Sequence, residues 1–207
     1  MNPDLLEELA ASTDRAVQAL VVSWLAGELT DEEFVALATA AIERAEAEGA
    51  ALSDLAVAAT LEAGAVGVLP LATGRARAVA QALVREADPA SLVTIRRTPG
   101  TDPVEFVRGL RAELEEGGHD REWYAERHRL IKVLERAQVE TRAEVLDAAQ
   151  TASGRAVRAQ GADWTRRLNR GACELCQDLA GDTLPSHAEM YRHKGCGCTQ
   201  RPIKKEN

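Results

Sequence analysis

The chain has 207 residues, of which 45% are apolar but only 3% are aromatic, and its formal net charge is −8. Its apolar runs are all shorter than the roughly 20 residues that span a bilayer, so we expect no membrane-spanning segment and no membrane partner. That length suits one large or two small domains.

The charge is unevenly distributed along the chain. Residues 1–153 hold 15 Lys/Arg against 27 Asp/Glu, whereas residues 154–207 hold 10 against 6. An acidic body repels DNA, but a basic C-terminal part could contact phosphates without sequence preference. The same excess is also ordinary for a solvated surface, and both interpretations stay open. The candidate nucleic-acid contacts are Arg166, Arg167, Arg170 and Lys194.

Capping residues and apolar residues at three- and four-residue spacing predict helices through most of the first 160 residues. Pro3 begins the first helix, and Thr30 with Glu33 forms a capping box for the second. We expect Gly49 to end that second helix and a third to cover 53–62. Residues 64–74 are rich in glycine but lack the Gly-Lys-Ser/Thr of a phosphate loop, so we interpret them as an apolar connector.

Two shorter helices are predicted at 75–87 and 103–116, with an irregular segment or short strand at 89–101 between them. Asp120 then caps the longest helix, which extends to about Gln160 and is about 60 Å long at 1.5 Å per residue. One face of this helix should be buried against other helices. That face comprises Leu130, Ile131, Val133, Leu134, Ala137, Gln138, Thr141, Val145, Ala148, Ala149 and Ala152.

The remaining residues predict a small β-rich module. Residues 163–168 and 199–203 have the composition of strands, and 177–179 with 183–184 resemble a hairpin around a turn at 180–182. The predicted fold is therefore mainly α with a small C-terminal β-rich module, an α+β chain. We expect an N-terminal helical domain over 1–118, the long helix over 119–161 and the module over 162–207.

All four cysteines lie in the module, in two pairs. Cys173-x-x-Cys176 is followed by His193-x-x-Cys196-x-Cys198. Two such pairs are typical of a tetrahedral zinc site, and glycines beside the second pair let the backbone wrap around a small centre. Five donors compete for four positions, so either His193 or Cys198 could complete the set. His187 is a less favoured donor because it lies in a polar loop. A structural Zn²⁺ is the expected cofactor, since so small a module cannot bury a sufficient core alone.

Three other interpretations of the cysteines remain. Two disulfides would need an oxidising compartment, which an opening amphipathic helix does not suggest. A redox Cys-x-x-Cys normally follows a strand in a βαβ unit, and no such alternation is present. A catalytic zinc would need an open position and a general base, for which Glu174 and Glu189 are the candidates.

These residues resemble a known family. Trp164, Cys173-x-x-Cys176, Leu179-x-Gly181, His193-x-x-Cys196-x-Cys198 and Pro202, preceded by a long helix, are similar to the C-terminal signature of phage Mu F-like minor head proteins. The chain has Lys194-Gly195 where the family has Pro-Asn, and Gly197 where it has Arg. The family's Arg-Thr-Glu box matches only loosely within 140–144.

The resemblance implies a bacteriophage virion morphogenesis protein, which would be a minor capsid protein associated with the portal. Its expected partners are the portal, capsid or scaffold proteins, with non-specific DNA contact as a possibility. Its expected location is the virion or procapsid interior, and the host cytoplasm during assembly. A capsid maturation protease or another zinc-dependent hydrolase is the alternative, and a DNA-binding zinc module is a second. The sequence contains no recognisable catalytic constellation, so we assign no catalytic residue.

Overall fold

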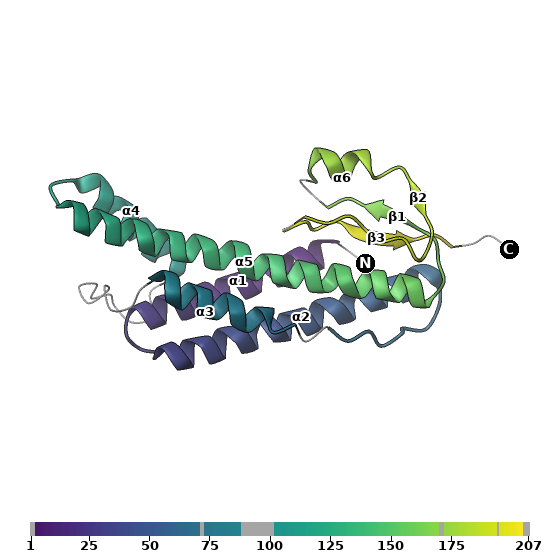
Figure 1. Ribbon diagram of the computed structural model, residues 1–207, viewed down its shortest axis with the longest axis horizontal. Coiled ribbons are helices and arrows are strands. Elements are labelled where there is room, and N and C mark those ends of the chain that lie inside the picture. The colour runs from purple at the N-terminus through teal and green to yellow at the C-terminus, as the bar shows by residue number, and fades with distance from the viewer. Residues whose placement is uncertain (1–2, 71–72, 88–101, 170–171, 194, 205–207) are drawn as a thin grey trace. The chain divides into compact units, whose positions relative to one another are not determined.

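The computed structural model describes residues 3–70, 73–87, 102–169, 172–193 and 195–204 (Figure 1). Most of these residues are helical, and a small antiparallel sheet follows the last long helix, as predicted. The elements in chain order are α1 (Pro3–Leu25), α2 (Asp31–Leu61), α3 (Arg75–Ala87), α4 (Pro103–Glu116), α5 (Arg121–Ala159), β1 (Trp164–Arg167), α6 (Glu174–Asp178), β2 (Thr183–Leu184) and β3 (Thr199–Pro202). No described helix is both long enough and apolar enough to cross a membrane.

The chain divides into two compact units. The terminal unit comprises Met1–Ala11, Arg44–Ala72 and Ala143–Asn207, and the bundle unit comprises Ser12–Glu43 and Thr73–Arg142. Helices α1, α2 and α5 each contribute residues to both units. The boundaries of the units therefore differ from those of the predicted parts, 1–118, 119–161 and 162–207. The terminal unit therefore combines the β-rich module with parts of three helices.

The predicted helix starts are confirmed by their hydrogen bonds. At the start of α2 the Thr30 amide donates to Glu33 Oε2 (2.8 Å) and the Glu33 amide donates to Thr30 Oγ1 (3.2 Å). Asp102 accepts from the Val104 amide (2.9 Å), and Asp120 accepts from the Trp123 amide (2.9 Å). These carboxylate and hydroxyl caps satisfy amides that lack a partner inside the helix. The predicted strand or irregular segment at 89–101 lies outside the described residues.

The prediction that Gly49 ends a helix is wrong, because α2 continues through it to Leu61. A Cβ placed on Gly49 would lie 3.5 Å from Ala149 Cβ and 3.7 Å from Leu9 Cδ2. Glycine here marks a close approach of α1, α2 and α5 within the terminal unit. The packing offsets the roughly 1 kcal/mol of helix propensity that glycine lacks relative to alanine.

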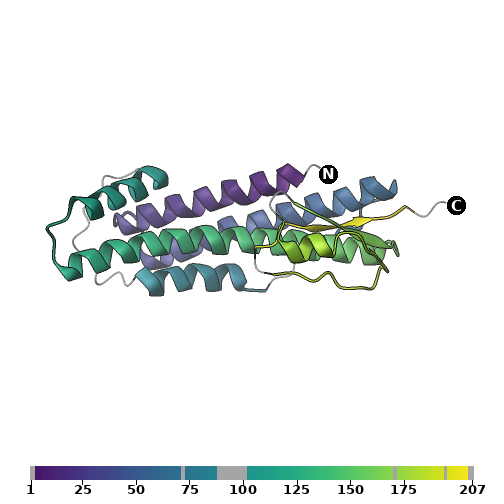
Figure 2. The same ribbon diagram turned by 90° about the horizontal axis from the view of Figure 1, so that it is seen from above.

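The predicted buried face of α5 is largely confirmed. In the bundle unit Leu130, Val133, Leu134 and Ala137 pack with residues of α1 to α4 in one apolar core. In the terminal unit Val145 and Ala149 pack with α1 and α2. Gln138 is the exception, since it is exposed. Figure 2 shows α4 running beside the first half of α5, where Arg111 pairs with Glu135 (3.3 Å).

The glycine-rich connector after α2 is held by a buried carboxylate. Asp54, which is 3% exposed, accepts hydrogen bonds from the amides of Val66 (3.1 Å), Gly67 (2.6 Å) and Val68 (3.1 Å). These three bonds lower the pKa of Asp54 against the opposing effect of its burial. Amides that could otherwise receive a phosphate are thus occupied by the chain's own side chain, consistent with a connector rather than a phosphate loop.

In the module, β1 is the central strand between β2 and β3, and both pairings are antiparallel. Trp164 on β1 is fully buried among Ala50, Val57 and Val157 of the helices, and its indole Nε1 donates to Pro185 O (3.1 Å). The predicted hairpin of 177–179 with 183–184 is wrong. Residues 174–178 form the short helix α6, and β2 pairs with β1 instead.

We predict opposite effects from two substitutions at Gly49. Gly49→Ala should stabilise the protein by about 0.5–1 kcal/mol, because a methyl group meets only ordinary van der Waals contacts and alanine favours a helix. Gly49→Leu should destabilise it by about 1–3 kcal/mol through overpacking. Urea unfolding monitored by circular dichroism measures both. A stabilising leucine would show that the helices do not approach closely at this point.

Candidate metal centre

The two cysteines of the first pair lie on one helical turn. Cys173 is the residue that precedes α6, and the Gln177 amide donates to its carbonyl oxygen (3.0 Å), so that Cys176 follows three residues later on the same face. The loop between β2 and β3 carries the second set of donors, His193, Cys196 and Cys198. In both views α6 and the sheet lie along the C-terminal half of α5 (Figures 1 and 2).

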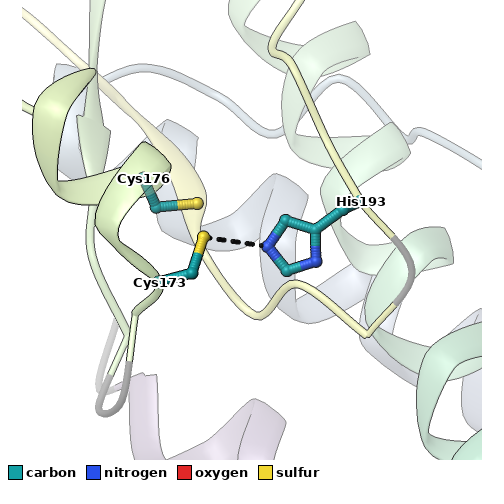
Figure 3. A group of neighbouring side chains, drawn as sticks. All are labelled: Cys173, Cys176 and His193. Atoms are coloured by element: carbon teal, nitrogen blue, oxygen red, sulfur yellow. Dashed lines mark hydrogen bonds between the residues drawn. The ribbon is translucent and has the colours of Figure 1, made fainter.

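The structure brings all five predicted donors together. Their ligand atoms form two groups of three, and within each group every atom lies within 4.8 Å of the others. Cys173, Cys176 and His193 form one group, and Cys176, Cys196 and Cys198 form the other. Because Cys176 belongs to both, it links the five residues into one cluster that could bind a metal ion. Figure 3 shows the first group, in which the Cys173 thiol and the His193 ring face each other.

Two pairs of donors lie close together, and each joins the first cysteine pair to the later segment. Cys173 Sγ lies 3.2 Å from His193 Nε2, and Cys176 Sγ lies 3.7 Å from Cys196 Sγ. All four cysteines are free thiols, whereas a disulfide would bring two sulfurs to about 2.05 Å. The geometry therefore favours the metal interpretation over two disulfides.

Burial divides the donors into an exposed pair and a buried trio. Cys173 and His193 are exposed, whereas Cys176, Cys196 and Cys198 are at most 5% exposed. Burial and neighbouring thiols raise the pKa of Cys176 to about 12, and burial also raises the pKa of Cys198. A hydrogen bond from the Cys176 amide is the main factor that lowers the pKa of Cys173. A metal ion that binds here must therefore displace protons from the buried thiols.

A buried arginine lies beside the cluster. Arg166 on β1 is 5% exposed, and its guanidinium donates to Cys176 Sγ (3.3 Å) and to Tyr191 O (2.7 Å). A buried cation is costly unless it is paired. If a metal ion displaces the proton of Cys176, the donor shared by both groups, the resulting thiolate would pair with this guanidinium. Arg166 was predicted as a nucleic-acid contact, because the sequence of a short basic strand does not show which of its arginines is buried.

Three other side chains hold the donor loop. Gln150 of α5 donates through Nε2 to Cys196 O. Arg192 donates to Thr151 Oγ1 (2.6 Å) and pairs with Asp147 (3.2 Å), which anchors the residue before His193 to α5. The Cys198 thiol donates to Asn169 Oδ1 (3.4 Å). Sequence reasoning missed these residues because their partners are distant in the chain.

A side chain at Gly197, between the last two cysteines, would have to displace the ends of two neighbouring side chains. A Cβ there would lie 2.5 Å from Asn169 Nδ2 and 2.8 Å from Glu7 Oε1, two groups that are hydrogen-bonded to each other (3.2 Å). Real Cβ atoms do not approach so closely, so any side chain would separate this pair.

Several predicted residues are not part of the cluster. His187, Glu174 and Glu189 are exposed, and the metal-binding groups found among the described residues contain no carboxylate. For nucleic acid, the proposal of Arg166 as a contact is corrected, because its guanidinium is buried and bonded within the module. Arg167 is half-buried, and Arg170 and Lys194 lie outside the described residues.

Neither family models, curated proteins nor solved structures gave a match to this chain.

We predict that Cys176→Ser abolishes metal binding, because this thiol belongs to both donor groups. Native mass spectrometry of the purified protein should find about one metal ion per chain in the wild type and essentially none in the variant. The matched control is His187→Ala, which changes a nearby histidine outside the cluster and should keep the metal. Equal metal content in Cys176→Ser and the wild type would contradict the assignment.

We predict that Arg166→Met weakens metal binding by about 10–100-fold, the usual effect of removing a group that supports a ligand. Co²⁺ is a suitable probe, since thiolate-to-cobalt absorption reports the ligands while a chelator competes for the ion. Arg167→Met, on the same strand, is the control and should bind Co²⁺ as the wild type does. An unchanged affinity and spectrum in Arg166→Met would mean that the buried arginine only fills space.

Proposed function

We propose that the cluster holds a structural zinc ion that fastens the module, and that this chain is a phage minor head protein of the Mu F-like type. Its role would be to assemble with other head proteins rather than to catalyse a reaction. The observation that carries the proposal is the convergence of five sulfur and imidazole donors from two separate segments of the module.

The donor chemistry and spacing fit zinc. Zinc–sulfur bonds are about 2.3 Å and zinc–nitrogen bonds about 2.0–2.1 Å, so a tetrahedral site has sulfur–sulfur edges of about 3.8 Å and sulfur–nitrogen edges of about 3.6 Å. The Cys176–Cys196 and Cys173–His193 separations of 3.7 and 3.2 Å lie near these edges. Thiolate-rich sets also disfavour magnesium, calcium and manganese, which prefer oxygen.

A structural role fits better than a catalytic one. Five protein donors are more than enough to fill four positions, whereas a catalytic zinc keeps one position for water or substrate. Glu174 and Glu189 are the candidate general bases. Both are exposed, and neither belongs to a donor group. We therefore prefer an assembly protein to a zinc-dependent protease or hydrolase.

The residues that carry the family resemblance all lie in the β-rich module, which supports the proposal. Trp164 and Pro202, the first and last of them, are register partners across β1 and β3. The cysteine and histidine residues lie between them in the chain and meet in the cluster. The long helix α5 directly precedes the module, as the resemblance implies.

In this proposal the helices offer the surfaces that bind portal, capsid or scaffold proteins inside the procapsid. Large apolar residues are exposed on several helices, including Leu37 (46%), Leu55 (58%), Val104 (64%) and Val139 (57%). Scattered exposed apolar residues are common, but protein interfaces draw on such residues.

We predict that the chain is found in purified procapsids and virions of the virus that encodes it, in few copies per particle. Quantitative mass spectrometry of gradient-purified heads measures this. Cys176→Ser should reduce incorporation strongly, because the module would lose its zinc, whereas His187→Ala should be incorporated normally. If the chain were absent from both kinds of particle, the assignment as a head protein would be wrong. The zinc assignment would still stand in that case, provided that the purified protein binds metal.

A further inference from the structure

A small polar hollow lies in the terminal unit, on the side of the module where β3 meets α2 and α5. Its volume is 30 Å³, which is enough for about one oxygen atom with its hydrogens. It is lined by Ser53, Ala56, Val57 and Thr60 of α2, Ser153 of α5, Arg167 of β1 and residues 199–202. None of these residues belongs to the metal cluster.

The hollow contains a buried donor without a partner. Ser53 is 1% exposed, and its Oγ makes no hydrogen bond within the described structure. A buried hydroxyl without a partner is destabilising, so native structures retain one mainly where a ligand or a bound water satisfies it. The neighbouring Ser153 hydroxyl is also buried, and it donates to Gln200 O (3.3 Å).

The charge lining the hollow is entirely positive. Among the described residues, Arg167 and Arg201 are the charged residues that line it, and no carboxylate does. Asp54, which follows Ser53 in the chain, is turned to the amides of residues 66–68. Guanidinium groups and hydroxyl donors together are the usual partners of phosphate oxygens.

We propose that this hollow is an oxyanion site that takes one oxygen of a phosphate group, with Ser53 donating to that oxygen. Arg201, an exposed residue of the lining, supplies a guanidinium for the remaining phosphate oxygens. The phosphate is either free or part of a nucleic-acid backbone, since both present the same oxygens. The site is independent of the zinc proposal, because it shares no residue with the metal cluster.

Thermal unfolding of the full chain tests the site with inorganic phosphate as the probe. About 10 mM phosphate, compared with chloride at equal ionic strength, should raise the Tm by about 2–4 °C. Ser53→Ala and Arg201→Gln should each remove most of this shift. Ser53→Ala should still fold, because the hydroxyl it loses has no protein partner and alanine favours a helix.

Arg158→Gln is the matched control, because it removes one positive charge from an exposed position on α5 in the same unit. It should keep the full phosphate shift. Equal Tm values in phosphate and chloride would overturn the proposal and assign the hollow to a water molecule. A shift that Arg158→Gln also loses would overturn it in favour of general charge screening.

A second arm distinguishes the sources of the phosphate. Fluorescence anisotropy with a labelled single-stranded oligonucleotide should show weak binding that Ser53→Ala and Arg201→Gln reduce and Arg158→Gln does not, if a nucleic-acid backbone supplies the oxygen. A phosphate shift in Tm with oligonucleotide binding unchanged by all three variants would assign the site to free phosphate.

Discussion

Two polar side chains of α5, Gln150 and Ser153, hold the backbone on which the donor residues lie. Gln150 donates to Cys196 O, and Ser153 donates to Gln200 O. The module has only short strands and a five-residue helix, and a segment of that size cannot bury enough apolar surface to be stable alone. Its position therefore depends on these bonds and on Trp164, whose indole is buried among residues of α2 and α5. These bonds hold against α5 the C-terminal end of the loop that carries His193, Cys196 and Cys198.

A buried positive charge, that of Arg166, lies beside the metal cluster. Zinc with four thiolates carries a net charge of −2, and zinc with three thiolates and a neutral histidine carries −1. Arg166 places one positive charge 3.3 Å from Cys176 Sγ, in a position shielded from water. In such surroundings opposite charges attract more strongly than at the surface. One buried guanidinium balances a three-thiolate site with His193 more closely than a four-thiolate site. That balance favours His193 as a ligand, although the exposure of His193 and Cys173 leaves this edge of the site open to solvent.

Local signals in the sequence predicted much of this structure. Capping residues such as Thr30, Asp102 and Asp120 specify helix starts through bonds to amides two or three residues away, so they can be recognised without the fold. The five donors could be found because their spacing is typical of residues that share one metal ion. Gly49 was misinterpreted because its effect on the helix depends on Ala149 and Leu9, which are distant in sequence. Arg166 was predicted as a nucleic-acid contact, and the buried hydroxyl of Ser53 was missed, because the partners of a single polar side chain depend on residues that are distant in sequence.

The central claim is that four of the five donors, the four cysteines and His193, hold one structural zinc ion, and X-ray absorption at the zinc K-edge tests it most directly. The account predicts a four-coordinate shell dominated by sulfur at about 2.3 Å, with at most one nitrogen ligand at about 2.0–2.1 Å. A shell dominated by oxygen or nitrogen, or one with an open position filled by water, would contradict it.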